Sequence, residues 1–202
     1  MSDENKRFGK VLITAMVAIV AFLWLAGFNN GIKISSNNNK FLDESTFFSD
    51  YVMEKYPDGT ISATDFQEYD IIVYNAWAPW CTACVKEMPC LNELYKEYKD
   101  QGILVVGIVA DYENEIGYYP DYDIDIANAV KAYDIDYPIA LGDSRFLEEI
   151  GPTMDNCLPC TWIIDKNGNL VDYFIGSKSE DDWKELFAKW ESMIEEGTLD
   201  EK

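Results

Sequence analysis

One stretch of this 202-residue chain constrains its fold more than any other: an apolar run leads to two cysteines, and a helical apolar pattern follows at once. The run 71–77 is short and rich in β-branched and aromatic residues, as a buried strand is. After Cys84, apolar residues recur every three or four positions, namely Val85, Met88, Leu91, Leu94, Tyr95 and Tyr98. The stretch therefore predicts a buried strand followed directly by a helix, with Cys81 and Cys84 at the junction.

The position of these two cysteines predicts redox chemistry. Cys81 falls at the first turn of the predicted helix, where unpaired N–H groups and the helix dipole favour a thiolate over a thiol. Cys84 lies one turn further along, which is close enough for a readily reduced disulfide. We expect an exposed Cys81 to attack and a less exposed Cys84 to resolve.

A metal site is the alternative, because two cysteines separated by two residues also form half of a zinc site. A second pair, Cys157 and Cys160, exists, but the chain contains no histidine. A module that holds zinc, copper(I) or an iron–sulfur cluster on Cys81, Cys84, Cys157 and Cys160 therefore stays open. We favour redox chemistry with no metal and no cofactor, since the first pair follows a buried strand near a βαβ pattern.

The N-terminal segment predicts a membrane anchor. Residues 11–28 carry no charge and would extend about 27 Å as a helix, just enough for a bilayer core of roughly 30 Å. A cleaved signal peptide is the alternative, but small residues do not stand at the positions that cleavage needs. We predict a cytoplasmic tail at 1–10, a single-pass anchor at 11–28, a flexible tether at 29–40 and an extracytoplasmic domain at 41–202.

The formal net charge of −21 excludes the usual nucleic-acid-binding protein, which needs a basic face. The acidic residues are interpreted as a solvated surface, which keeps a protein soluble but does not specify its fold.

The remaining pattern alternates strands and helices. The continuous apolar run 103–110 predicts a strand buried on both faces, joined to the first by a right-handed parallel crossover. An Asn-Gly turn at 166–169 predicts a hairpin. The further expected elements are a short helix and an edge hairpin within 41–69, a loop at 111–125, a helix at 126–133, a strand at 138–141, a helical turn at 145–150, hairpin strands at 161–165 and 170–175, and a closing helix with a stripe from Trp183 to Ile194.

Two strings of residues resemble a known family. The first runs from Asn75 to Cys81 as NAWAPWC and continues with Cys84, Glu87, Met88 and Pro89. The second comprises Leu158, Pro159, Thr161, Ile164, Asp165 and Gly168. Together they resemble the TlpA/ResA group of membrane-anchored, thioredoxin-like thiol-disulfide oxidoreductases, from about Gly59 to the C-terminus. The resemblance implies an α/β thioredoxin-like fold with a central mixed β-sheet flanked by helices.

The resemblance also implies roles for single residues. Cys81 matches the nucleophile and Cys84 the resolving thiol. Glu87 matches an acidic residue that lies near the dithiol and assists proton transfer or raises thiol pKa values. A solvated helix carboxylate is the alternative for Glu87. Asn75 stands where thioredoxin has a buried acid, and Pro89 matches a structural helix proline.

Substrate contacts are implied on both sides of the dithiol. Pro159 matches a cis-proline whose loop, with Leu158, offers backbone groups to an extended client. Trp80 is a candidate for gripping the client, whereas core packing is expected for Trp77.

The remaining cysteines depart from the family pattern. Cys160 stands where Thr is usual, and Cys157 stands two residues before the proline. They are interpreted as a second redox pair that relays electrons to or from Cys81 and Cys84, as a static bridge or as unpaired core thiols. A redox role is favoured, because their loop is expected to face the dithiol. Cys90 is expected to be a plain buried thiol.

The resemblance implies thiol-disulfide exchange on the outer face of the cell membrane. Clients would be exported proteins with cysteine pairs, prominently apocytochrome c, and an integral-membrane thiol donor would supply electrons. A thiol peroxidase is a weaker alternative.

Overall fold

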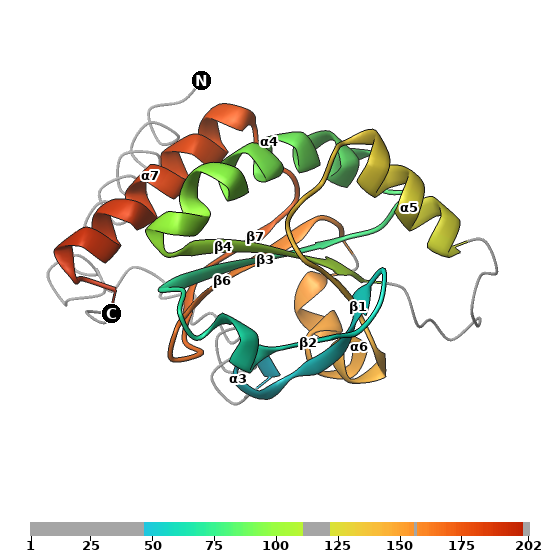
Figure 1. Ribbon diagram of the computed structural model, residues 1–202, viewed down its shortest axis with the longest axis horizontal. Helices are drawn as coiled ribbons and strands as arrows, with labels where there is room; N and C mark the ends of the chain where they lie inside the picture. The colour runs from blue at the N-terminus through green and yellow to red at the C-terminus, as the bar shows by residue number, and fades with distance from the viewer. Residues whose placement is uncertain (1–46, 111–121, 156, 200–202) are drawn as a thin grey trace, which may run out of the picture. The chain divides into compact units, whose positions relative to one another are not determined.

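The computed structural model describes residues 47–110, 122–155 and 157–199, and Figure 1 shows their arrangement. The expected tail, anchor and tether, and residues 41–46 of the expected domain, lie outside these ranges. Among the described residues, none of the helices combines the length and the apolar character that a membrane crossing needs.

Within the described residues, seven strands form one mixed sheet in the order β2-β1-β5-β4-β3-β6-β7. β3 is parallel to β4 and β4 to β5, whereas the other neighbouring strands are antiparallel. The strands are β1 (Val52–Tyr56), β2 (Thr60–Ser62), β3 (Ile71–Trp77), β4 (Ile103–Val109), β5 (Ile139–Leu141), β6 (Cys160–Asp165) and β7 (Leu170–Ile175).

Helices cover both faces of this sheet, so the predicted thioredoxin-like α/β architecture is confirmed. Figure 1 shows α4 (Thr82–Tyr98), α5 (Tyr122–Ala132) and α7 (Glu180–Glu196) on one face. The other face carries α3 (Phe47–Asp50) and α6 (Ser144–Glu149). Short 3-10 turns complete the described fold: η1 (Ala63–Phe66), η2 (Lys99–Gln101) and η3 (Gly151–Met154).

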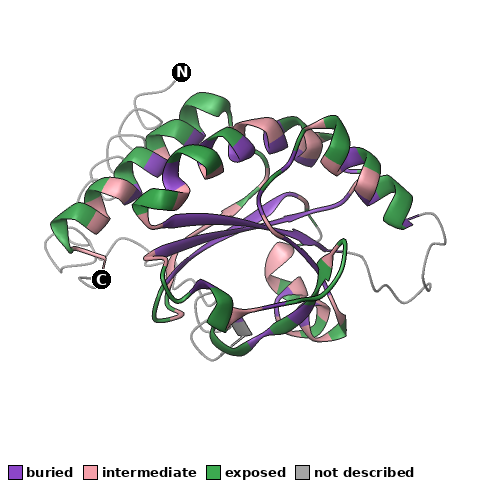
Figure 2. Ribbon diagram, in the orientation of Figure 1, coloured by how far each residue is buried: buried purple, intermediate pink, exposed green. Residues whose placement is uncertain are grey.

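The strands β3, β4 and β6 are buried along their whole length (Figure 2). Because successive side chains of a strand point to opposite faces, their apolar residues divide between two cores. The dithiol-side core lies under α4, α5 and α7 and contains Trp77, Met88, Trp183, Phe187 and Trp190. The opposite-side core contains Phe48, Tyr74, Phe146 and Trp162.

The helix α5 begins earlier than expected. Tyr122 is its first residue, so the loop predicted over 111–125 is wrong for 122–125, and residues 111–121 lie outside the described ranges. Tyr122 and Ile126 are buried one turn apart, and Asp123 and Asp125 lie in the first turn. Carboxylates are favourable near the positive end of a helix, which explains why this acidic segment is helical.

The predicted hairpins are confirmed. β1 and β2 pair around a turn in which Lys55 donates its backbone N–H to the carbonyl of Gly59. β6 and β7 pair around Gly168, whose φ of 84° lies in the left-handed region that glycine adopts readily. The N–H of Gly168 donates to the carbonyl of Asp165.

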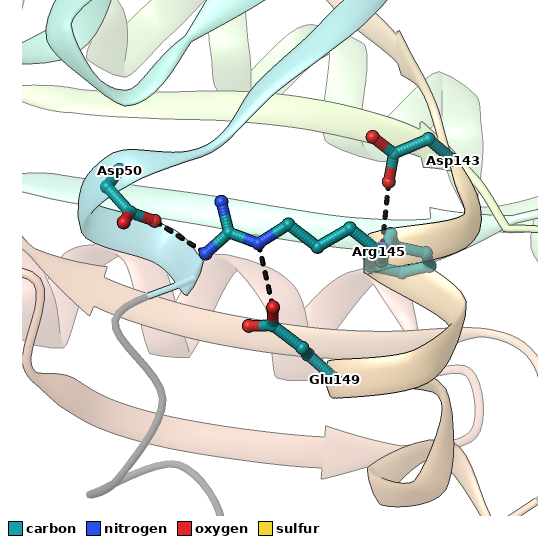
Figure 3. A network of polar contacts seen from close by, with 5 residues as sticks. Asp50, Asp143, Arg145 and Glu149 are labelled. Atoms are coloured by element: carbon teal, nitrogen blue, oxygen red, sulfur yellow. Dashed lines mark hydrogen bonds and ion pairs between the residues drawn. The ribbon is translucent and has the colours of Figure 1, made fainter.

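A polar network joins α3 to α6 on the face opposite α4 (Figure 3). Arg145 donates to Asp50 and to Glu149, both at 2.7 Å. Asp143 caps α6 by accepting from the backbone N–H of Phe146 at 2.8 Å. These ion pairs are partly exposed, so each contributes only about 1 kcal/mol or less.

Candidate active site

Cys81 and Cys84 form a disulfide at the N-terminal end of α4, with their Cα atoms 5.3 Å apart. Cys81 is the N-cap residue, and its Sγ accepts a hydrogen bond from the backbone N–H of Cys84 at 3.2 Å. The predicted junction of strand and helix is therefore confirmed. An amide N–H directed at this sulfur stabilises negative charge on it once the bond is reduced.

The expectation of an exposed Cys81 is wrong. Cys81 is 6% exposed and Cys84 is fully buried, so the order of exposure holds but the difference is small. The chain turns tightly after β3, because the N–H of Cys81 donates to the carbonyl of Ala78 at 3.0 Å. This turn brings Cys81 against the dithiol-side core together with Trp77.

The two tryptophans that flank this turn have different environments. Trp77 is fully buried in the dithiol-side core, which confirms the expected packing. Trp80 is 65% exposed and lies directly before Cys81 in the chain. The Trp80 ring therefore forms part of the surface beside the disulfide.

The Leu158–Pro159 peptide bond is cis, as expected. Pro159 is buried, and its carbonyl accepts from the N–H of Gly176 at 2.8 Å. Cys160 pairs with Ala76 in antiparallel register, so the residues before Cys160 lie at the same end of the sheet as those after Ala76. The proline loop and the dithiol are thus at one end of the sheet, with Leu158 half-buried.

Glu87 is buried, so its interpretation as a solvated carboxylate is wrong. Its Oε1 accepts from Nδ2 of Asn75 at 3.0 Å. Its Oε2 accepts from the backbone N–H of Lys178 at 3.1 Å and from Nε1 of Trp183 at 3.2 Å. Glu87 lies three residues after Cys84 on α4, and residues at this spacing share one face of a helix.

Burial raises the pKa of Glu87 above its ordinary value, because a charged carboxylate is poorly solvated in the core. The hydrogen bonds from Lys178, Asn75 and Trp183 and the charge of Lys178 oppose this effect without cancelling it. A carboxyl group with a raised pKa keeps its proton to a higher pH than an ordinary glutamate, which suits it to proton exchange with a neighbouring group.

A groove of about 600 Å³ gives Glu87 contact with the surface. It runs along the first turns of α4 and the segment that leads into α7. Glu87 and Cys90 line it together with Thr82, Lys86 and Lys178. Protons can reach Glu87 by this route without crossing the core.

Sequence reasoning missed two donors to this carboxyl group, Trp183 and Lys178, and one further partner of Asn75, Thr161. Trp183 was expected only as part of the apolar stripe of the closing helix. Lys178 carried no signal, because its hydrogen bond comes from the backbone N–H and its charge acts from a segment distant in sequence. Thr161, whose Oγ1 accepts from Asn75 at 3.1 Å, could have been found from the sheet register, since it pairs directly with Asn75.

The expected relay between the second cysteine pair and the dithiol is wrong, because the two pairs do not face each other. Cys160 is buried in the opposite-side core, whereas Cys81 and Cys84 belong to the dithiol-side core. Cys157 is exposed, and both are free thiols. The four cysteines therefore do not converge on one point, and the described residues hold no group of three or more metal-ligating side chains.

Cys90 was expected to be buried, but it is half-buried on α4, where it packs against the edge of the dithiol-side core. Burial, with the charges of Glu180, Glu93 and Glu87, raises its pKa to about 11.

Three comparisons bear on these residues. The model of the AhpC/TSA family matches residues 47–173. The thiol-disulfide oxidoreductase ResA of a Bacillus cereus strain is 36% identical over 110 residues, which cover 54% of this chain and 57% of that protein. The chain thus spans little more than half the length of this relative. The ResA of Bacillus thuringiensis subsp. konkukian is 30% identical over 129 residues, covering 64% of this chain and 68% of the relative.

Solved structures share the fold at lower identity. StoA from Bacillus subtilis superposes with a TM-score of 0.51 at 19% identity, covering 67% of this chain and 93% of that chain. A DsbF homologue from Corynebacterium diphtheriae superposes with a TM-score of 0.56 at 23% identity, covering 69% of this chain and 83% of that chain.

Proposed function

The chain belongs to the AhpC/TSA family and, within the thioredoxin-like proteins, to the ResA-type thiol-disulfide oxidoreductases, and on this basis we propose that it exchanges disulfides with client proteins through Cys81 and Cys84. The observation that carries the proposal is the disulfide at the N-cap of α4, one helical turn before a buried carboxyl group. A disulfide that only stabilised the fold would not require a position at a helix N-terminus or a buried carboxyl group nearby.

In the reductive direction, the Cys81 thiolate attacks a client disulfide, and one client sulfur leaves as a thiolate and takes up a proton. Cys84 then loses its proton and attacks the Cys81 sulfur of the mixed disulfide. The second client sulfur leaves and is protonated, so the client gains two electrons and two protons while Cys81 and Cys84 become a disulfide. The oxidative direction is the reverse.

Glu87 serves this cycle as a proton acceptor and donor for the dithiol. Its position on the same helix face as Cys84 and its raised pKa support this role. The groove beside it supplies the exchange with solvent.

The client lies between Trp80 and the proline loop. Trp80 offers an exposed ring, and Leu158 and Pro159 border the same end of the sheet. An extended client segment gains hydrogen bonds where it runs beside backbone groups that lack a strand partner.

The domain acts outside the cell membrane, held by residues 11–28 and the tether at 29–40. Its clients are exported proteins with cysteine pairs, including apocytochrome c before haem attachment, and an integral-membrane thiol donor returns it to the reduced state. Support comes from the apolar N-terminal run with its preceding basic residues and from the resemblance to the anchored group.

Insulin reduction with dithiothreitol tests the exchange activity. Cys81→Ser should abolish catalysis. Cys84→Ser that has been reduced and then freed of dithiothreitol should accumulate a mixed disulfide with the client, because no resolving thiol remains. Cys90→Ser is the matched control and should retain activity. Full activity in Cys81→Ser would exclude Cys81 as the nucleophile. Release of the chain from membranes by deleting residues 11–28 tests the anchor separately.

A further inference from the structure

The side chain of Cys160 lies on the far side of the sheet from the dithiol. Cys160 is the first residue of β6, and its thiol points into the opposite-side core with Phe146 and Trp162. Cys157 is exposed three residues earlier. One thiol is thus accessible to an incoming disulfide, whereas the other is shielded, which is the asymmetry that a stepwise exchange requires.

The thiol of Cys160 lies against the backbone of Cys157. Its Sγ is 3.5 Å from the carbonyl oxygen of Cys157 and 3.7 Å from that of Met154. The carbonyl of Met154 also accepts the backbone N–H of Cys157, at 2.9 Å. Both cysteines therefore reach the same oxygen atom. Because Cys157 is exposed, its side chain has room to rotate about the Cα–Cβ bond.

A tyrosine completes the surroundings of the buried thiol. The Tyr173 hydroxyl lies 4.0 Å from Sγ of Cys160 and donates to the carbonyl of Thr153 in η3. Burial raises the pKa of Cys160 to about 11, because the thiolate would be poorly solvated there. Cys160 is therefore suited to a second, slower step rather than to the first attack.

We propose that Cys157 and Cys160 form a second redox pair, separate from the dithiol, which closes to an intramolecular disulfide by exchange with low-molecular-weight or protein disulfides. The Cys157 thiolate attacks the incoming disulfide and releases one of its sulfurs as a thiol. The Cys160 thiolate then attacks the Cys157 sulfur and releases the other. The reagent gains two electrons and the two protons that the cysteines lose.

This inference does not depend on the proposed function, because the pair reacts when Cys81 and Cys84 are replaced. The full chain carrying Cys81→Ser and Cys84→Ser is incubated with glutathione disulfide, blocked with N-ethylmaleimide and digested with trypsin. Cleavage after Arg145 and Lys166 places Cys157 and Cys160 on one peptide, while Cys90 falls on another.

The expected product is a 146–166 peptide lighter by two hydrogens and unlabelled, with Cys90 fully labelled. Closure should accelerate about tenfold per pH unit below the pKa of Cys160, since its thiolate is the attacking species. Cys160→Ser is the matched control and should stop at a glutathione adduct on Cys157. A stable adduct on Cys157 with Cys160 intact, or two labelled thiols after the incubation, would overturn the proposal.

The unmodified chain provides a second measurement that does not rely on the serine variants folding. In a series of glutathione redox buffers, the 56–86 and 146–166 peptides report the two pairs independently. Two separate transitions are expected. A 146–166 peptide that stays fully labelled throughout, or disulfides that link it to the 56–86 peptide, would contradict a separate second pair.

Discussion

The side-chain amide of Asn75 donates to the carboxylate of Glu87, with 3.0 Å between Nδ2 and Oε1. The same nitrogen donates to Thr161, so one side chain of β3 connects α4 with β6. Because an amide replaces the acid that thioredoxin has here, Glu87 is the titrating partner in this contact. The effect of its protonation can therefore be tested by changing Glu87 alone.

Glu87→Gln should make the reduced dithiol more reactive at neutral pH. A negative Glu87 disfavours a second negative charge on a nearby sulfur, and glutamine removes that repulsion. Alkylation of Cys81 by iodoacetamide at pH 7 should become about three- to tenfold faster, with the pH profile displaced to lower pH. Glu97→Gln, an exposed change on the same helix, should leave the profile unchanged. Identical profiles for all three proteins would remove Glu87 from the proton chemistry.

The stability of the protein should depend on pH through Glu87. Its folded pKa is raised, so the folded state retains a proton that the unfolded chain has lost. This contribution to stability is complete below the ordinary glutamate value and disappears as the pH rises through the raised pKa. The free energy of unfolding, measured in urea between about pH 4 and pH 8, should therefore decrease as the pH rises. The Glu87→Gln variant should not show this decrease. Parallel curves for both proteins would contradict the shift.

Gly107→Ala should destabilise the fold next to the site. A Cβ at Gly107 would lie 3.0 Å from Nε1 of Trp77 and 3.0 Å from the ring of Tyr137, both in the dithiol-side core. Overpacking of this kind costs about 1–3 kcal/mol, measurable as a lower urea midpoint. Gly151→Ala is the control, because its Cβ would meet only Met154 at 3.8 Å. Equal stability of both variants would show that Trp77 and Tyr137 can move aside.

Trp80→Ala should weaken the binding of protein clients without impairing the chemistry. The ring is 65% exposed, so its loss should cost about 1 kcal/mol of stability or less. A lost aromatic contact of about 1 kcal/mol corresponds to a roughly fivefold higher KM for insulin. The rate with a small disulfide such as glutathione disulfide should stay the same, and Trp80→Phe should preserve most of the binding. A reduced rate with both substrates would instead place Trp80 in the exchange step.

The elements with strong periodicity were predictable from the sequence. The stripe from Val85 to Tyr98 became α4, and the apolar run at 103–110 became β4, because long buried elements need regular apolar patterns. The start of α5 was not predictable in this way. Tyr122 to Asp125 reads as a polar loop, and only its packing and its position at the helix end explain the helix.

The chemistry of the site was predictable where it is local in sequence. Cys81 and Cys84 are close along the chain, whereas the donors around Glu87 come from β3, the start of α7 and the segment before it. Burial of Glu87 depends on these distant contacts, so α4 alone could not reveal it. The orientation of Cys160 follows from the alternation of side chains along a strand. Thr161 faces Asn75, so Cys160, one residue earlier, faces the other side of the sheet.

The half-buried position of Cys90 protects the chain from its own reactivity. With its pKa raised to about 11, the Cys90 thiol stays protonated at pH 7. A protein that breaks and forms disulfides passes through mixed disulfides that any nearby thiolate can intercept. Cys90 lies on α4, the helix that begins at the dithiol, and in its protonated form it does not attack such intermediates. Disulfide scrambling within the enzyme is thereby suppressed by the packing of one side chain.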